Sequence, residues 1–258
     1  MRRVALAIVV SSLAVSACRV SPPVPATVSP IALSRQLVVV TTPGWDSTTG
    51  TLQRFERARN GDAWHAVGTA TPIVVGRTGL AWGIGFDAVP GAQASAPRKR
   101  EGDGRSPAGV FPLDTVFGFQ PLAASPAVGL PYVSLTDQTD CVDDPSSVHY
   151  NTVVARDRVS RVDWSSAERM RSIDQYKLGV IVGYNAAPPV PGRGSCIFLH
   201  IWSGPASTTA GCTALDAREL GAVVAWLDAS RRPMLVQLTA SEYQRLRGRW
   251  DLPELPAS

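Results

Sequence analysis

Short β-prone segments recur along the chain and constrain its fold more than any other feature. Each is rich in Val, Ile, Phe or Thr and is bounded by Gly, Pro, Asn or Asp, which is typical of β-strands joined by turns. The 258 residues include 22 Gly and 21 Pro, and only 18% are charged, which disfavours a helical bundle. The segments span residues 36–42, 51–57, 64–67, 73–77, 179–184, 196–201 and 234–238. This pattern predicts one mainly β domain over residues 36–258.

Three helices are expected among these strands. Residues 165–176 have the pattern of a surface helix. A capping-box-like sequence at Asp216 starts a second helix that ends near Leu227. A similar sequence at Thr239 starts a third, which is expected to be the shortest.

The first 17 residues have the pattern of a secretory signal peptide. A basic start, Met1-Arg2-Arg3, is followed by an apolar stretch too short to span a bilayer, and small residues precede Cys18. Residues 15–18, Val-Ser-Ala-Cys, resemble the bacterial lipobox, so Cys18 is expected to be lipidated and to become the mature N-terminus. The alternative is ordinary cleavage beside an unmodified cysteine.

Residues 18–35 are rich in Pro and are predicted to form an extended linker between the anchor and the domain. Arg19, rather than Asp, follows Cys18, which favours the outer membrane where that sorting rule applies. The protein is therefore expected to be exported and to lie on the periplasmic face of the cell envelope, with a lipid anchor as its contact with the membrane.

The basic residues are scattered, and the formal net charge is only +4. The one basic run, Arg98-Lys99-Arg100, is predicted to be a solvated loop, because nucleic-acid binders concentrate positive charge on one face. Nucleic acid is therefore not an expected partner, whereas an anionic wall polymer could be attracted weakly.

The cysteines indicate a free thiol. If Cys18 is lipidated, Cys141, Cys196 and Cys212 remain in the domain, and in an oxidising compartment two of them would pair. Cys212 is flanked by small residues that leave room for a substrate, so we expect Cys141 and Cys196 to form the disulfide.

Cys212 and His200 are the candidate nucleophile and general base. Gly211 allows backbone N–H groups to point at a developing oxyanion, and the nearby helix start is expected to lower the pKa of the thiol. In the strand 196–201, an apolar face is buried and His200 is presented from the other face. A turn-rich hairpin is expected between His200 and Cys212. A thiol needs such a base to react at neutral pH.

His200, Thr209 and Gly211-Cys212 together resemble the signature of the YkuD-type L,D-transpeptidases, in the ErfK/YbiS/YcfS/YnhG-like branch. Residues 102–111 are similar to the family's G-x-[TS]-P-x-G-x-[FY] motif. The resemblance extends loosely over residues 36–238. It implies a mainly β sandwich with a few short helices, a cysteine at the edge of a cleft, and a backbone carbonyl, that of Ile201, that orients the ring of His200.

The sequence also departs from the family pattern. Ala210 and Ala214 stand where the family has a second His and an Arg, and Ile201 rather than Gly follows His200. The thiol chemistry survives these changes, but a usual contact to the substrate carboxylate does not.

The resemblance implies a cysteine-dependent transfer of acyl groups from peptidoglycan stem peptides. Cys212 would attack the L,D-peptide bond after the third residue, release D-alanine and hold the acyl group as a thioester until an amine takes it. Two alternatives remain open: an L,D-carboxypeptidase or hydrolase that uses water, and a non-catalytic peptidoglycan-binding lipoprotein. No cofactor is required, and the oligomeric state is not predicted.

A zinc site is the alternative for Cys141, Cys196, His200 and Cys212. Cys196 and His200 lie about 13 Å apart along an extended strand, too far for shared coordination, and no CxxC pair exists. We therefore expect no metal.

The stretches 82–106 and 117–144 are loop-rich, and loops of such length inside a domain are more often functional than idle. Asp143, Asp144 and His149 could line a cleft and hold a substrate amine, so His149 is a candidate substrate-binding residue with Thr209. The alternative is a capped, hydrogen-bonded loop.

Overall fold

The computed structural model describes residues 29–84, 95–124, 129–186 and 188–256. The predicted signal peptide and Cys18 lie outside the described residues. The strands are β1 (Gln36–Thr42), β2 (Thr49–Glu56), β3 (His65–Val74), β4 (Leu80–Trp82), β5 (Ser106–Gly118), β6 (Tyr132–Ser134), β7 (Thr139–Val142), β8 (Val153–Ala155), β9 (Ala167–Arg169), β10 (Leu178–Val182), β11 (Phe198–Ile201), β12 (Thr213–Leu215) and β13 (Met234–Thr239). The α-helices of this part of the chain are α1 (Ala217–Trp226) and α2 (Ala240–Trp250).

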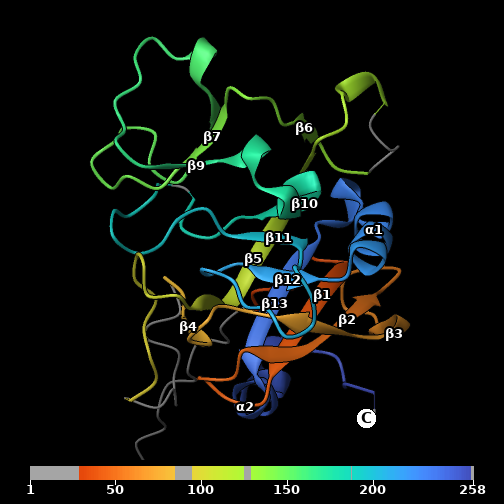
Figure 1. The fold of residues 1–258 in the computed structure, drawn as a ribbon. Coiled ribbons are helices and arrows are strands. Elements are labelled where there is room, and N and C mark those ends of the chain that lie inside the picture. Colours follow the sequence, from red (N-terminus) through yellow and green to blue (C-terminus); the bar gives the residue numbers. More distant parts are fainter. Residues whose placement is uncertain (1–28, 85–94, 125–128, 187, 257–258) are drawn as a thin grey trace, which may run out of the picture.

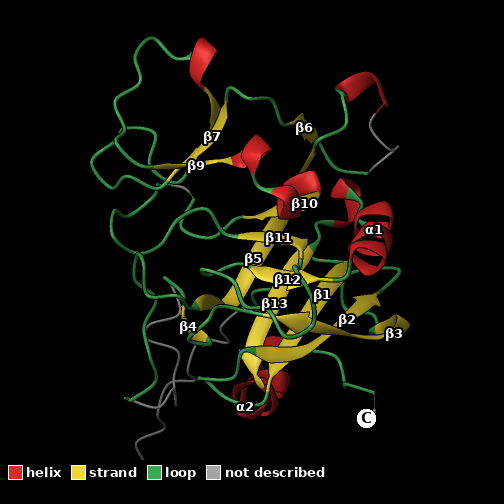
Figure 2. Cartoon of the chain, viewed as in Figure 1, coloured by secondary structure: helices red, strands yellow, loops and turns green. Residues whose placement is uncertain are grey.

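Eight of these strands form a closed barrel (Figures 1 and 2). Their order is β10-β11-β12-β3-β2-β1-β13-β5, and β5 pairs back onto β10 to complete the ring. The pairs β1–β13 and β11–β12 are parallel, and the other pairs of the ring are antiparallel. The mainly β class is thus confirmed, but the main sheet closes on itself rather than forming the two separate layers of the predicted sandwich.

Apolar residues fill the barrel and the space beneath the helices. All of β1 except Thr41 is buried, because one face points into the barrel and α2 packs against the strand from outside. In α1 the buried residues are Leu220, Val223 and Val224, and this helix contacts β10 and β11. Burial of each such side chain contributes about 1.5–3 kcal/mol, so the helices hold the site-bearing strands in place.

Both predicted capping sites are confirmed. The Asp216 carboxylate accepts a hydrogen bond from the Arg218 N–H at the start of α1, and the Thr239 hydroxyl accepts one from the Glu242 N–H at the start of α2. The helix after Thr239 has 11 residues against 10 in α1, so the expectation that it is the shorter was wrong.

The predicted helix at residues 165–176 was wrong. Strand β9 occupies part of it and pairs with β7, and two 3₁₀ turns, Met170–Ser172 and Asp174–Lys177, follow. The predicted segments 64–67 and 73–77 contribute residues 65–67 and 73–74 to one longer strand, β3. Strand β5, the longest, had no predicted counterpart, because Pro107, Gly109 and Pro112 interrupt its pattern.

A second, three-stranded sheet, β8-β7-β9, lies at one end of the barrel (Figure 1). Part of the predicted linker is also folded: Ile31 is fully buried, and the Arg57 guanidinium donates to the carbonyls of Ile31, Ala32 and Ser34. Among the described helices, none has both the length and the hydropathy needed to cross a bilayer.

Candidate active site

Cys212 lies just before β12 with its side chain buried among aromatic and apolar residues, and it is the free cysteine of the described chain. Its Sγ accepts a hydrogen bond from the Phe198 N–H at 3.3 Å and donates to the Cys196 carbonyl at 3.4 Å. The thiol is therefore held against the start of β11.

Two hydroxyl groups, one from a distant segment and one from the turn before Cys212, fix the backbone of Cys212. The Ser106 Oγ donates to the Cys212 carbonyl at 2.8 Å, and the Thr209 Oγ1 donates to the same oxygen at 2.6 Å. Ser106 is fully buried and also accepts from the Gly76 N–H at 2.9 Å. The two motifs noted in the sequence, at 102–111 and 209–212, thus meet at one carbonyl.

His200 is oriented by its own strand. Its Nδ1 lies 2.8 Å from the Ile201 carbonyl oxygen, which only accepts, so Nδ1 carries the proton and Nε2 is left as the basic nitrogen. The role expected of the Ile201 carbonyl is thus present. Burial lowers the pKa of His200, so the ring is neutral near pH 7.

Strand β11, which carries His200, and strand β12, which begins one residue after Cys212, are adjacent and parallel. His200 pairs with Ala214, and both Ala214 and Cys212 line the pocket that His200 lines. The hairpin expected between the two residues was wrong, because β11 and β12 run in the same direction and residues 202–212 return the chain to the end at which β11 began.

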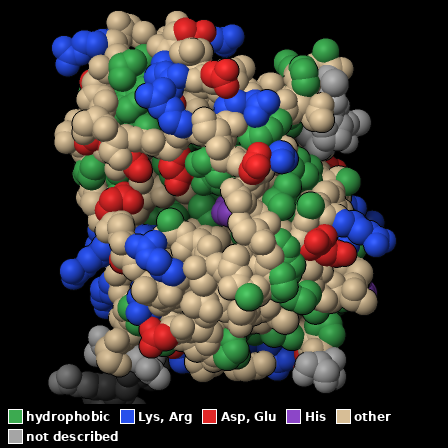
Figure 3. All heavy atoms as spheres, in the orientation of Figure 1, with side chains coloured by type: hydrophobic (Ala, Val, Ile, Leu, Met, Phe, Trp, Pro, Cys, Tyr) green, Lys and Arg blue, Asp and Glu red, His purple; other side chains and the backbone are tan. Residues whose placement is uncertain are grey.

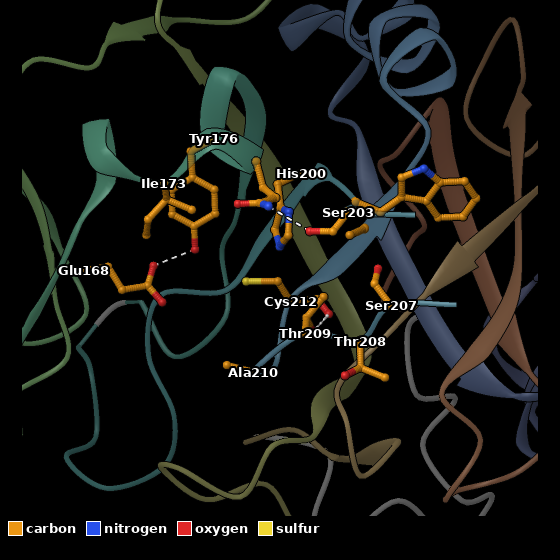
Figure 4. Close-up of a pocket in the computed structure, with 13 residues that line it drawn as sticks. Glu168, Ile173, Tyr176, His200, Ser203, Ser207, Thr208, Thr209, Ala210 and Cys212 are labelled. Atoms are coloured by element: carbon orange, nitrogen blue, oxygen red, sulfur yellow. Dashed lines mark hydrogen bonds between the residues drawn. The ribbon is translucent and has the colours of Figure 1, made fainter. Parts of the chain in front are cut away.

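The two side chains line one pocket of about 280 Å³. Figure 3 shows a hollow near the middle of the molecular face in view, and a histidine side chain is visible in it. In Figure 4 the Cys212 sulfur is directed towards the side on which Tyr176 and Glu168 lie. The hydrogen bonds of the thiol are made with backbone groups of Cys196 and Phe198, at the start of β11, and not with His200. The remaining lining residues are Glu168, Ile173, Gln175, Tyr176, Trp202, Ser203, Ser207, Thr208, Thr209, Ala210 and Ala214.

The pKa of the Cys212 thiol is raised well above its ordinary value, chiefly by burial and then by the negative charge of Glu168. The hydrogen bond from the Phe198 N–H and the nearby Tyr176 hydroxyl act in the opposite direction and are outweighed. The expected lowering by the helix start was wrong, because β12 separates Cys212 from α1 and the N-terminus of the helix is not at the thiol.

Gly211 and Thr209 shape the turn before the nucleophile. The Gly211 N–H donates to the Thr209 Oγ1 at 3.2 Å, so this N–H is engaged within the turn and is not itself directed at an oxyanion. A Cβ at Gly211 would lie 3.1 Å from the Arg105 carbonyl oxygen, which explains why a glycine fits there. Thr209 lines the pocket, but its hydroxyl is occupied by this turn and by the Cys212 carbonyl.

Glu168 and Tyr176 are site residues that the sequence did not reveal. The Tyr176 hydroxyl donates to the Glu168 Oε2 at 2.6 Å, and the Tyr176 ring contacts the His200 ring edge-on with centroids 5.2 Å apart. Burial raises the pKa of Glu168 to about 7 and also raises the pKa of Tyr176. Both residues fall in the segment predicted as a surface helix, and no motif marks them.

The predicted disulfide between Cys141 and Cys196 is present, with 6.0 Å between the Cα atoms. Cys141 pairs directly with Glu168 across β7 and β9, so the side chains of these two residues share a face. The disulfide therefore connects β7, the neighbour of the strand that carries Glu168, to the segment that contacts Cys212. Because Cys141 and Cys196 are bonded to each other, they cannot serve as the thiolate ligands of the zinc site considered above.

A second pocket of about 180 Å³ reaches Cys212 from another side. It shares Cys212, Glu168 and Ala210 with the first pocket, so these residues form the wall between the two. Its other lining residues are Arg77, Lys99, Glu101, Gly102, Asp143, Ser195, Cys196, Ile197 and Gly211.

Other candidate residues are placed differently. His149 lines neither pocket at Cys212, and its ring contacts Trp164 edge-on, so its predicted substrate-binding role is not supported. Asp144 accepts hydrogen bonds from Ser146 and Ser165, which hold the pKa of its carboxyl well below the usual range; this is the capped loop considered as the alternative.

The predicted solvated loop at residues 98–100 was only partly right. The Lys99 side chain is buried, and its Nζ forms an ion pair with Asp103 at 2.7 Å. Its pairing with an acidic partner leaves little of its positive charge to attract another molecule.

Comparison with protein-family models found no match, and comparisons with curated proteins and with solved structures found none either. The likeness to the L,D-transpeptidases consequently remains one of short motifs.

Proposed function

We propose that this protein is a cysteine acyltransferase of the L,D-transpeptidase type. The observation that carries the proposal is the placement of one free thiol, that of Cys212, in a pocket with an imidazole whose Nδ1–H is fixed and whose Nε2 is free to accept a proton. A nucleophile, a base and a third group that orients the base are the elements of thiol acyl transfer.

In this proposal the resting thiol and imidazole are both neutral. Burial disfavours the charged form of each, so proton transfer from Sγ to Nε2 accompanies attack on the substrate carbonyl. The S–C bond forms as the amide C–N bond breaks, and the imidazolium returns its proton to the departing amine. The thioester then reacts with an acceptor, and the thiol is restored.

The substrate class rests on the resemblance. We propose peptidoglycan stem peptides as acyl donors and envelope localisation through lipidated Cys18. The barrel would be this chain's form of the family fold. Exposed hydroxyls at Ser203 and Thr208 in the first pocket suit a polar peptide backbone.

The test is mass spectrometry of the purified protein incubated with a tetrapeptide muropeptide. An adduct of the tripeptide acyl group on Cys212, with release of D-alanine, is the expected result. Cys212→Ala is the matched control and should give neither. A protein that binds muropeptide but forms no adduct and releases no D-alanine is the non-catalytic wall-binding protein, and the proposal is then wrong.

A hydrolase differs from a transferase only in the acceptor. Product analysis with and without an added amine separates the two, because a hydrolase yields only the free acid. The surroundings of Glu168 bear on this choice.

A further inference from the structure

The reaction proposed above assigns no role to Glu168. It lines both pockets that meet at Cys212, so its carboxyl is in the wall between them, beside the nucleophile. His200 lines only the first pocket. A group that enters from the second pocket therefore meets Glu168 on its way to Cys212.

The carboxyl is held firmly. The Tyr176 hydroxyl donates to Oε2 at 2.6 Å, and strand β9 is paired with β7 at Cys141, whose disulfide to Cys196 fixes the sheet to the start of β11. The Cys196 carbonyl in turn accepts the hydrogen bond of the Cys212 thiol. Strand pairing and the disulfide thus hold Glu168 in the wall of the two pockets that Cys212 also lines.

The second pocket favours a cation. Glu101 accepts hydrogen bonds from Ser195 and Tyr150, and the Oδ1 of Asp143 is buried without a hydrogen-bond partner in the described part of the chain. The positive charge of Lys99 is compensated by Asp103, so the carboxyl groups of Glu101, Asp143 and Glu168 outnumber the one other cation of the pocket lining, Arg77. The titratable and charged groups around Glu168 are Tyr176, Cys212 and His200 in the first pocket, and Arg77, Lys99, Glu101 and Asp143 in the second.

We propose that Glu168 is the general base for the acyl acceptor, and that the acceptor is a primary amine that enters the second pocket as an ammonium ion. This rests on the proposed function and names the acceptor class. A carboxyl whose pKa is about 7 is half ionised at neutral pH, where a general base is most effective.

The ammonium ion gives one proton to the Glu168 carboxylate and becomes a neutral amine. Its nitrogen attacks the thioester carbon, the C–N bond forms, and the C–S bond breaks to release the Cys212 thiolate. His200 accepts the second nitrogen proton and returns it to the thiolate, and Glu168 loses its proton to solvent.

The test is how the thioester partitions between amine and water. Wild-type protein and Glu168→Gln are given a tetrapeptide muropeptide with Nα-acetyllysine amide, whose amine is an ammonium ion at neutral pH. The ratio of amide to free acid should fall about 100-fold in Glu168→Gln, within the usual range of general base catalysis. The ratio does not depend on the rate of acylation or on the fraction of folded protein, so a loss of folded protein alone does not change it.

Two controls isolate the proton transfer. Hydroxylamine is uncharged at neutral pH and needs no deprotonation, so its transfer ratio should be nearly the same in Glu168→Gln and wild type. Glu101→Gln removes one charge from the second pocket but not the base, so it should raise KM for the ammonium acceptor with little change in kcat.

An unchanged ratio in Glu168→Gln, or an equal loss of kcat in Glu101→Gln, overturns the inference while the proposed function stands. A wild-type protein that forms no thioester overturns the proposed function as well. The two failures are therefore distinguishable.

Discussion

At the scale of single residues, the site depends on a thiol and an imidazole that are both kept neutral by burial. The Ile201 carbonyl selects the tautomer of His200, and the Phe198 N–H and Cys196 carbonyl hold the Cys212 sulfur. Since the pKa of the thiol is raised, little thiolate is present at neutral pH without help. The proton acceptor should consequently dominate the rate.

His200→Ala should lower the rate of thioester formation by about two to four orders of magnitude while the fold is kept. The apolar strand face at Ile197 and Leu199 is untouched, so the melting temperature should change little. Hydroxide can replace the base, so the rate of this variant should keep rising with pH, whereas Cys212→Ala should stay inactive. Near-native activity of His200→Ala at neutral pH would identify another base, with Glu168 next in line.

Glu168 should make the protein less stable as the pH rises from about 4.5 to about 7. Its folded pKa is raised from 4.5 to about 7, so in this window the folded state binds more protons than the unfolded state, and stability falls with pH. Glu168→Gln should remove this loss of unfolding free energy. The loss is on the order of 2 kcal/mol, because each pKa unit corresponds to 1.36 kcal/mol and the partly exposed side chain is screened by solvent.

The measurement is urea unfolding of wild type and Glu168→Gln at pH 4.5 and pH 8. The difference in free energy of unfolding between the variants should shift in favour of Glu168→Gln at pH 8. His200, whose pKa is lowered, acts in the opposite direction in both proteins and cancels in the comparison. A difference that is independent of pH would show that the Glu168 carboxyl titrates normally.

At the scale of elements, the site is assembled where β5, β11 and β12 approach one another and the small sheet β8-β7-β9 is attached. The first residue of β5, Ser106, connects the barrel to the carbonyl of Cys212. The disulfide connects the small sheet to β11. Loss of either connection should affect both stability and chemistry.

Ser106→Ala should lower the free energy of unfolding by about 1–3 kcal/mol, since it leaves the buried Gly76 N–H without its partner. It should also slow thioester formation, because the Cys212 carbonyl keeps only the Thr209 hydroxyl. Chemical denaturation and single-turnover acylation measure the two effects. Exposed Ser166→Ala is the matched control and should change neither.

Replacing Cys141 and Cys196 together with Ala should lower the free energy of unfolding by about 4 kcal/mol in the loop-entropy model, given their separation of 55 residues. Transfer to an amine should fall more than acylation, because Glu168 loses its fixed position. Thiol counting on unreduced, denatured wild-type domain should find one reactive thiol, that of Cys212. Three reactive thiols would contradict the disulfide.

At the scale of the whole molecule, the closed barrel leaves the site on one face, and α2 packs on β13 and β1. Residues 29–35 pack onto the barrel, so any spacer to an anchor at Cys18 is shorter than the sequence suggested. If Cys18 is the anchor, as proposed, the domain lies closer to the membrane than a linker of residues 18–35 implied.

Cys18→Ala should move the protein from the membrane fraction to the soluble fraction, because the lipid would have no attachment site. Fractionation with immunodetection measures this, and Cys212→Ala should remain with the membrane as a control. Unchanged partitioning of Cys18→Ala would place the anchor elsewhere.

Features that depend on neighbouring residues were predictable from the sequence. The strand at 36–42 matches β1 residue for residue, and the caps at Asp216 and Thr239 start helices, because β-propensity and capping act over a few residues. The free thiol at Cys212 and the oriented ring of His200 were also expected, since short motifs and a cysteine count carry that information.

Only the tertiary structure decided what depends on distant residues. Closure of the barrel requires β5 to pair with β10 and β13, and its prolines concealed the strand. Glu168 reaches Cys212 only because β9 pairs with β7 and the disulfide ties β7 to β11. The raised pKa of the thiol has the same origin: the sequence placed a helix start nearby, but β12 separates it from Cys212, and the burial that raises the pKa is a property of the whole fold.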